Sequence, residues 1–340
     1  MKTTDKLLIG LLAGAGASYG LKSWLRSKRR IDLAGRVVVI TGGTTGLGLL
    51  LAKQAAERGA VLVLAARAAH DLEAADAEVR SHGARDVLTV PTDVADDDQA
   101  QALIAVTIER FGRIDVLLNN AGVMMVGPVA AMTLDDYRNL LGTNFWGAVH
   151  TTLAALPHMR AARSGRIANI ISIGGKFAAP HMAPYIASKF ALTGFTKALR
   201  AELTRDDILV TGIYPQTIRT GGHAHAWFKG DRQAEYTWFA LGDTVPGLAI
   251  SADATARNAW TAICDGDPEL LVGLPTRIAV VFDNLFPEWS AELTALIERS
   301  MPGPVNLDGP AVQGKDLSGA IPGLLSRLIP AAARPNGVGG

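Results

Sequence analysis

The sequence predicts an α/β fold in which a single domain contains a doubly wound parallel sheet. Short apolar runs with little polar alternation recur along the chain, as expected of parallel strands that are buried on both faces. Segments with helical patterning separate these runs, and strands that alternate with helices imply a parallel sheet covered on both sides. The expected strands are 37–41, 61–66, 87–90, 114–119, 166–171, 208–214 and 269–272, and the main expected helices are 96–111, 133–161, 184–204 and 252–264.

The first strand leads into a glycine-rich turn, Thr41-Gly42-Gly43-Thr44-Thr45-Gly46-Leu47-Gly48. A helical pattern then runs over 49–58, and Gly59 stops it. A strand, a glycine turn and a helix N-terminus together favour an anion, because bare N–H groups and the positive end of the helix dipole face it. The glycines also let the backbone approach a ligand closely. The turn therefore predicts a phosphate site, and a turn that binds no ligand is the alternative.

Tyr185 and Lys189 stand four residues apart just after Pro184, at the expected start of a helix. This spacing places both side chains on one helical face. An ammonium group beside a phenol favours the phenolate, so we expect a lowered Tyr185 pKa and a pair suited to proton transfer. Taken alone, the pair also fits an ordinary helix surface. Ser172, thirteen residues upstream of Tyr185, and the glycine turn favour an active site.

Further motifs follow in order along the chain. They are Asp93-Val94 after the third strand, Asn119-Asn120-Ala121-Gly122 after the fourth, Thr143-Asn144 in the long helix and Asn169-Ile170-Ile171-Ser172 after the fifth. With the two preceding motifs, they resemble those of the classical short-chain dehydrogenase/reductases over about residues 33–275. The resemblance implies a Rossmann-like catalytic domain that interconverts a carbonyl and an alcohol with a nicotinamide cofactor.

The resemblance also implies residue roles. Tyr185 would be the general acid in reduction and the base in oxidation, Lys189 would hold the nicotinamide ribose, Ser172 would bind the substrate oxygen, and Asn144 would anchor the proton relay. The resemblance also implies a set of cofactor contacts, to which the end of the second strand adds Arg67. The full set is Gly42, Thr44, Thr45, Gly46, Leu47, Gly48, Arg67, Asp93, Val94, Asn119, Ala121, Gly122, Tyr185, Lys189, Pro215, Ile218 and Thr220.

Two positions depart from the family pattern. Ile171 stands where the family often has a first serine, so only Ser172 remains. Gln216 follows Pro215 where the family has glycine, which puts the contacts to the nicotinamide carboxamide in question.

The end of the second strand bears on cofactor choice. In this kind of fold, a carboxylate there usually holds the adenosine ribose 2′-hydroxyl of NAD. Ala66 stands at that place and Arg67 follows it. A guanidinium suits a 2′-phosphate through bidentate hydrogen bonds. We therefore expect NADP(H) to be preferred over NAD(H), with a solvated arginine as the alternative.

The N-terminus carries an uncharged stretch, Leu7 to Leu21, followed by five basic residues within nine positions. Fifteen helical residues span roughly 22 Å, short of the roughly 30 Å hydrocarbon core, and snorkelling by Lys22 with residues 23–25 closes much of the gap. We expect residues 1–30 to be a membrane anchor, as in membrane-anchored members of the family, with the catalytic domain on the cytoplasmic side. Removing residues 1–30 is then expected to leave a soluble, folded and active enzyme. A signal peptide and a helix packed on the protein surface are the alternatives.

Composition excludes several classes of function. A net charge of +1 argues against a dedicated nucleic-acid binder. One cysteine, Cys264, rules out an internal disulfide framework and supplies no metal cluster. His223 and His225 stand two apart, but a metal site would need further ligands, so we expect no metal.

Two segments near the C-terminus remain open in role. The stretch 217–248 is rich in bulky apolar residues and predicts either an apolar, lipid-like substrate pocket or ordinary packing of a flap. The extension 276–340 has helical patterns over 288–301 and 321–329. It could complete the pocket, form a homo-oligomer or lie against the bilayer. A cofactor-binding but inactive sensor and a membrane-bound interaction protein are the alternatives to an enzyme, and the intact Ser172, Tyr185 and Lys189 set favours the enzyme.

Overall fold

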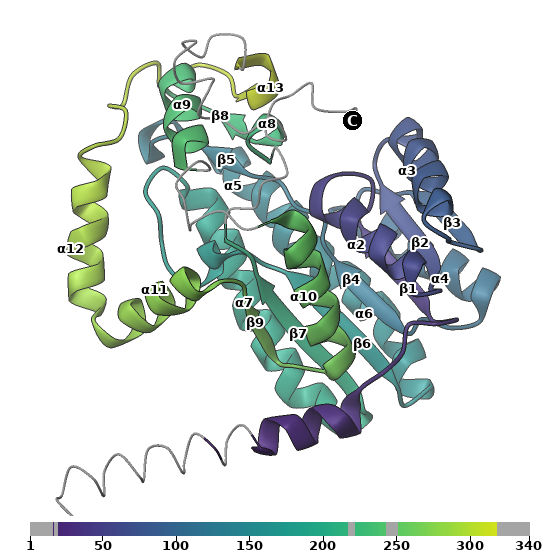
Figure 1. Ribbon diagram of the computed structural model, residues 1–340. Helices are drawn as coiled ribbons and strands as arrows, with labels where there is room; N and C mark the ends of the chain where they lie inside the picture. Colours follow the sequence, from purple (N-terminus) through teal and green to yellow (C-terminus); the bar gives the residue numbers. More distant parts are fainter. Residues whose placement is uncertain (1–15, 17–19, 217–221, 243–250, 318–340) are drawn as a thin grey trace, which may run out of the picture.

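A computed structural model describes residues 16, 20–216, 222–242 and 251–317. Its centre is a parallel sheet with the strand order β3-β2-β1-β4-β6-β7-β9 (Figure 1). The chain crosses over between β3 and β4, so β1 pairs with both β2 and β4. The predicted doubly wound sheet is thereby confirmed. The strands are β1 (Val37–Thr41), β2 (Val61–Ala66), β3 (Val87–Pro91), β4 (Val116–Asn119), β6 (Gly165–Ile170), β7 (Ile208–Tyr214) and β9 (Glu269–Leu271).

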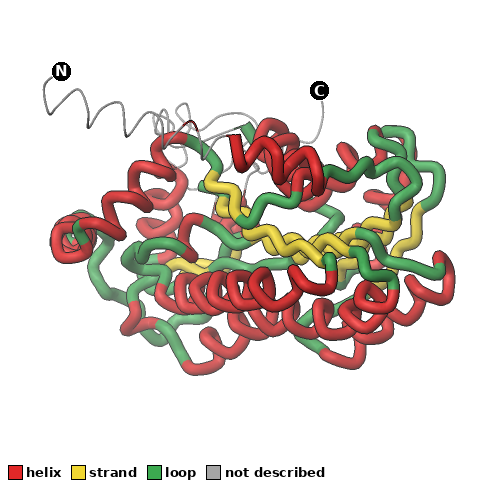
Figure 2. The backbone as a smooth tube through the Cα atoms, turned by 90° about the horizontal axis from the view of Figure 1, so that it is seen from below, coloured by secondary structure: helices red, strands yellow, loops and turns green. Residues whose placement is uncertain are grey.

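Helices cover both faces of this sheet (Figure 2). One face packs against α2 (Gly46–Glu57), α3 (Ala69–Ser81) and α10 (Ala252–Asp265), and the other packs against α4 (Asp97–Phe111), α6 (Gly147–Ala161) and α7 (Ala183–Leu203). Strand β1 shows why the apolar runs do not alternate. Val38 and Ile40 belong to the first core cluster, whereas Val37 and Val39 belong to the second. Both faces of the strand therefore exclude water.

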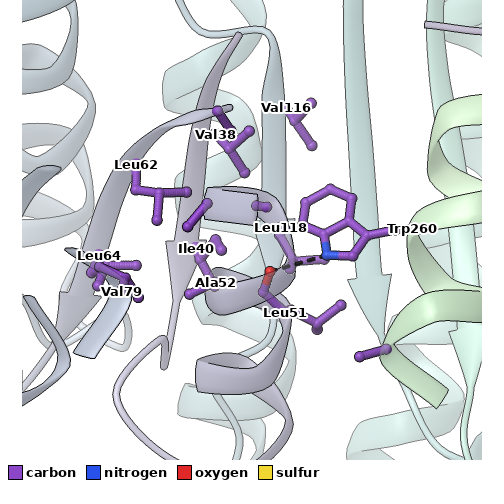
Figure 3. Packing of buried hydrophobic residues seen from close by; sticks show 14 of the residues in the cluster. Val38, Ile40, Leu51, Ala52, Leu62, Leu64, Val79, Val116, Leu118 and Trp260 are labelled. Atoms are coloured by element: carbon purple, nitrogen blue, oxygen red, sulfur yellow. Dashed lines mark hydrogen bonds between the residues drawn. The ribbon is translucent and has the colours of Figure 1, made fainter. Parts of the chain in front are cut away.

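Trp260 on α10 occupies the middle of the first core cluster and is fully buried (Figure 3). Its indole Nε1 donates a hydrogen bond of 3.0 Å to the backbone oxygen of Leu51 on α2. Because a buried N–H without an acceptor is costly, this bond lets the largest core side chain join the two helices. Those helices then hold the glycine turn in place above β1.

The long helix expected over 133–161 is present with one irregularity. Its first part is α5 (Leu134–Leu141), which begins at a capping box between Thr133 and Asp136. A single wide π turn, Gly142–Trp146, then joins α5 to α6. Such turns often occur at functional sites, and this one carries Asn144.

The part of the chain after the sixth expected strand is more structured than the sequence indicated. A small sheet of two-residue strands joins β5 (Met125–Val126), β8 (Trp227–Phe228) and β10 (Val312–Gln313). Near it lie α8 (Gly222–His225), α9 (Arg232–Gly242) and α13 (Gly314–Leu317) (Figure 1). Helices α11 (Leu274–Leu285) and α12 (Pro287–Glu298) form an extended arm at the side of the molecule. Helix α12 matches the helix expected over 288–301, and the one expected over 321–329 lies outside the described residues.

A helix over 20–29 packs at the opposite end of the sheet from the glycine turn (Figure 1). The guanidinium of Arg26 pairs with Asp267, and that of Arg30 pairs with Asp265, with an Nε–Oδ1 distance of 2.9 Å in each pair. The backbone oxygen of Arg29 accepts a hydrogen bond from buried Arg166 at 2.5 Å. Part of the basic flank of the expected anchor therefore binds the catalytic domain. In the part of the chain that the structure describes, no helix combines the length and the apolar character needed to cross a bilayer.

Candidate active site

A cavity of about 690 Å³ lies at the carboxyl ends of the parallel strands. In open α/β sheets, ligands bind at this edge, where the strand order reverses, and here the reversal falls between β1 and β4. Most of the residues expected from the sequence line this cavity. They are Gly42, Thr44, Thr45, Leu47, Arg67, Asp93, Val94, Ala121, Gly122, Ser172, Tyr185, Lys189 and Pro215.

The glycine turn is shaped by close backbone contacts. Gly42 has a φ of +63°, and a side chain there would begin 2.9 Å from the Cα of Ala121. A side chain on Gly48 would begin 2.0 Å from the oxygen of Gly42, so α2 can approach the turn only with glycine at that position. Gly46, with a φ of +54°, faces open space instead. The side chain of Thr45 makes no capping hydrogen bond to α2. These features fit a cradle for a phosphate group at the N-terminus of α2.

Asn120 holds this cradle to the next strand, a role that the sequence did not reveal. Its side-chain Nδ2 donates to the backbone oxygens of Thr41 at 3.1 Å and Gly42 at 2.8 Å. Thr41 in turn accepts a hydrogen bond at its Oγ1 from the Asn120 N–H. Asn119, expected as a cofactor contact, instead points into the core. It bonds to Thr152 and Asn169 and lies outside the cavity lining.

Tyr185 and Lys189 lie together on α7 and face the cavity, with the Lys189 Nζ 5.7 Å from the centre of the Tyr185 ring. Lys189 is 4% exposed, and its Nζ donates to the backbone oxygen of Ile170 at 3.2 Å. Ser172, which follows β6, lines the same cavity, and its hydroxyl acts to lower the Tyr185 pKa. Its Oγ also accepts from the Gly174 N–H at 3.0 Å. The three side chains expected to act together are therefore assembled on one wall.

Burial reverses one expectation about this group. The sequence argument predicted a lowered Tyr185 pKa, but burial raises that pKa above its usual value, and the Ser172 hydroxyl only partly offsets this. Burial also lowers the Lys189 pKa from 10.5 to about 8. The prediction was wrong because spacing reveals the neighbouring charge but not the loss of water around both groups. At neutral pH the Tyr185 phenol is therefore protonated and able to donate.

Asn144 connects the two halves of the site from the π turn. Its Nδ2 donates to the oxygens of Val123 and Ser188, each at 2.9 Å, and its Oδ1 accepts from the Val123 N–H at 2.8 Å. The Ser188 Oγ donates to the backbone oxygen of Tyr185 at 2.7 Å. A side chain on Gly122 would begin 3.2 Å from the Asn144 Oδ1 and 3.6 Å from the Lys189 Nζ. The loop after β4 is thus locked against α7.

Comparison with known proteins decides the family. The family model described as short chain dehydrogenase matches residues 36–228. The chain belongs to the short-chain dehydrogenase family. It is similar to 11-beta-hydroxysteroid dehydrogenase A of Sesamum indicum (40% identity over 56% of this chain and 54% of that protein). It is also similar to 11-beta-hydroxysteroid dehydrogenase 1A of Arabidopsis thaliana (31% identity over 89% and 86%).

A solved short-chain dehydrogenase/reductase from Burkholderia phymatum in complex with NAD has a TM-score of 0.71 with this chain at 26% identity, covering 76% of this chain and 96% of that one. A metagenomic short-chain oxidoreductase in complex with NADP has a TM-score of 0.58 at 27% identity, covering 71% and 98%. The match to the sesame protein spans about half of that protein's length. Family membership makes this chain an oxidoreductase of the kind that uses a nicotinamide cofactor.

The cavity fits such a cofactor in a short-chain dehydrogenase. Gln216, the residue that replaces the family glycine, lines the cavity and is 9% exposed. Its Oε1 accepts from Thr276 Oγ1 at 2.6 Å, whereas its Nε2 is buried without a hydrogen-bond partner. A buried donor of this kind calls for an acceptor, and a nicotinamide carboxamide offers one. Ile218 and Thr220, expected to contact the same group, lie outside the described residues.

Two further features of this site were not apparent in the sequence. His181, in the loop before Tyr185, pairs through Nδ1 with the Glu235 Oε1 of α9 at 2.6 Å. Glu235 is fully buried, and burial raises its pKa to about 8. The pair therefore joins the loop before α7 to helix α9. His225 lines the cavity, and among the described residues no cluster of His, Cys, Asp and Glu could hold a metal ion.

The depressed Lys189 pKa leads to a stability prediction. Between pH 8 and 10.5 the unfolded chain binds the Lys189 proton more strongly than the folded one, so stability rises with pH in that window. Below pH 8 the buried cation destabilises the fold by about 3 kcal/mol. We therefore expect Lys189→Met to unfold at higher denaturant concentration than wild type at pH 7 and to lose this advantage toward pH 10. Lys197→Met, at an exposed position on α7, is the matched control. A Lys189→Met protein no more stable than that control at pH 7 would contradict the prediction.

Proposed function

We propose that this short-chain dehydrogenase interconverts a carbonyl and an alcohol on an apolar, lipid-like substrate and prefers NADP(H) over NAD(H). The observation that carries the proposal is the grouping of Ser172, Tyr185 and Lys189 on one cavity wall. A cofactor-binding but inactive sensor would not need this complete set.

The chain's own groups suit proton transfer at the substrate oxygen. Ser172 donates a hydrogen bond to that oxygen and stabilises the charge that develops there. The phenol of Tyr185, kept protonated by burial, donates its proton to the same oxygen. The buried Lys189 ammonium stabilises the negative charge that remains on the Tyr185 oxygen after proton transfer. A bound reduced nicotinamide supplies the hydride for the carbonyl carbon. In the oxidation direction Tyr185 must first lose its proton, so we propose that alcohol oxidation accelerates with rising pH.

The remaining walls of the cavity favour an apolar substrate. Around Ser172 and Tyr185 the lining is mainly hydrophobic, with few polar groups besides the catalytic ones. These residues are Val123, Met124, Ile173, Phe177, Ala179, Met182, Ile186, Trp227 and Phe239. Two of the relatives named above are called steroid dehydrogenases, which supports a lipid-like substrate class here.

Replacing Tyr185 with Phe tests the mechanism. The change removes the proton donor and keeps the ring, so we expect turnover to fall at least about a hundredfold while the cofactor dissociation constant changes little. Turnover is followed by the absorbance of the reduced cofactor with a panel of apolar ketones and aldehydes. Tyr137→Phe, outside the cavity lining, is the control. Near-normal turnover by Tyr185→Phe would overturn the mechanism, and a wild type inactive on the whole panel would favour the sensor.

Arg67 is the basis for the cofactor preference. It is exposed, follows β2 directly and lines the cavity, as does Asp71. We expect Arg67→Ala to lower kcat/KM for NADPH about tenfold and to change that for NADH less than about twofold. Asp71→Ala should act in the opposite direction, because it removes a like charge from the 2′-phosphate. Arg85→Ala, at an exposed position away from the cavity, is the control. A wild type equally efficient with both cofactors would contradict the preference.

We also propose that the N-terminal segment attaches the protein to a membrane with the catalytic domain in the cytoplasm. The uncharged run from Leu7 to Leu21 and the basic residues behind it support this. The helix over 20–29 changes the design of the test, since its contacts to Asp265, Asp267 and Arg166 belong to the catalytic domain.

Fractionation with a high-salt wash checks the attachment. Full-length protein should stay with the membranes, because burial of apolar groups rather than charge would hold it there. Removal of residues 1–19 should release an active enzyme of unchanged stability. Removal of 1–30 should release one that is less stable by about 1–3 kcal/mol, because the buried Arg166 donor and two carboxylates lose partners. Full-length protein in the soluble fraction would refute the anchor.

A further inference from the structure

A second cavity lies beside the active-site cavity, between the loop that precedes α7, the flap helix α9 and the arm formed by α11 and α12. Its volume is about 310 Å³. It is bounded by apolar side chains such as Trp238 on α9, Ala279 and Phe282 on α11, and Leu293 and Ile297 on α12. We call it the arm cavity. From these contacts we propose that it binds the neutral, apolar tail of the substrate whose carbonyl reacts at Tyr185. The proposal rests on the proposed function and extends it to residues beyond the region matched by the family.

The arm cavity and the active-site cavity share part of their lining. Phe177, Ala179, Met182 and Phe239 line both of them, so these four side chains form a shared wall. Methionine has several accessible rotamers and adapts to irregular shapes. Met182 precedes α7 by one residue and Tyr185 by three. Only this shared wall therefore separates a substrate bound at Tyr185 from the arm cavity that would hold its tail.

Polar groups in the lining of the arm cavity form hydrogen bonds within the arm itself. The Ser290 Oγ donates to the Asp283 Oδ1 at 2.6 Å, and the Thr294 Oγ1 donates to the backbone oxygen of Ser290 at 2.7 Å. The Asp283 carboxylate would repel an anionic tail end. A tail that enters this cavity should therefore carry neither a carboxylate nor several hydroxyl groups.

Part of the apolar lining of the arm cavity is exposed to water. Phe282, Leu293 and Ile297 line the arm cavity, yet they are 39%, 51% and 39% exposed. An apolar tail would cover surface that water now contacts, and this burial is favourable. An apolar cavity of 150 Å³ holds benzene, so 310 Å³ has room for about twelve carbon atoms.

Helix α11 is hydrogen-bonded to a residue that lines the active-site cavity. The Oγ1 of Thr276, in the first turn of α11, donates to the Oε1 of Gln216, which lines the main cavity. This contact fixes the position of the arm relative to the reacting groups. The arm cavity therefore has a defined distance from Tyr185, as a tail subsite requires.

The test uses the full chain and a series of unbranched methyl ketones with four, eight and twelve carbons. Ala279→Trp fills the arm cavity from a position that does not line the main cavity, and Thr294→Phe fills it from α12 in case the first variant does not fold. Ala295→Trp, exposed on α12 and outside the lining, is the matched control. Melting temperatures confirm that each variant folds.

In wild type and Ala295→Trp we expect kcat/KM to rise about threefold per added CH₂ once the tail reaches the arm. In the filled variants the value for the twelve-carbon ketone should fall at least about tenfold, while that for the four-carbon ketone stays within about twofold. Equal losses on short and long ketones, or no loss on the long one, would overturn the tail subsite.

Binding of the neutral fluorophore N-phenyl-1-naphthylamine separates this inference from the proposed function. Its affinity should fall at least about fivefold in the filled variants and stay unchanged in Ala295→Trp. If wild type reduces no ketone but the fluorophore shows this pattern, the proposed function fails and the apolar subsite stands. If ketones are reduced but neither tail length nor fluorophore binding responds to the filled variants, the function stands and the arm cavity is not a subsite.

Discussion

The amide of Asn144 is the contact on which the geometry of the active site depends. It joins the backbone of Val123, in the loop after β4, to Ser188 on α7. Because Ser188 also bonds to the backbone of Tyr185, one buried side chain sets the distance between the loop along the cavity and Tyr185. The π turn makes this possible, since it rotates Asn144 relative to the regular helix on either side. A regular α-helix over the same residues would direct the amide elsewhere.

Burial gives these groups their chemistry. An exposed Tyr185 beside an exposed lysine would titrate near its ordinary pKa, and spacing alone predicted a downward shift. In the folded chain the loss of water dominates for both groups, so the phenol holds its proton more strongly and the ammonium holds it less strongly. The pKa of a lysine is normally slightly higher than that of a tyrosine. The two shifts reverse this order, so that the Tyr185 pKa lies above the Lys189 pKa.

The parts of the structure that were predictable from the sequence have strong local signals. Strands such as β1, β2 and β4 were predictable because they are short runs of largely apolar, buried residues. Tyr185 and Lys189 were predictable because their spacing depends only on α7. The small sheet was not, because its strands have two residues each and come from distant parts of the chain, β5 pairing with β8 and β8 with β10. The choice between Asn119 and Asn120 also escaped the sequence. Alternate residues of a strand point to opposite sides, and only the end of β4 decides which amide enters the cavity.

The position of the helix over 20–29 affects how a membrane-attached enzyme would obtain its substrate. This helix meets the sheet where β6 begins, through Arg166. It lies at the opposite end of the sheet (Figure 1) from the cavity that Tyr185 lines. The strands are about 20 Å long, so an attachment point at this helix and the active-site cavity would lie at opposite poles of the domain. An upright domain would present its cavity to the aqueous phase, away from the lipid. A domain lying on its flank would bring the side with α11 and α12 to the bilayer surface. Orientation at the membrane would thus determine whether substrate arrives from lipid or from water.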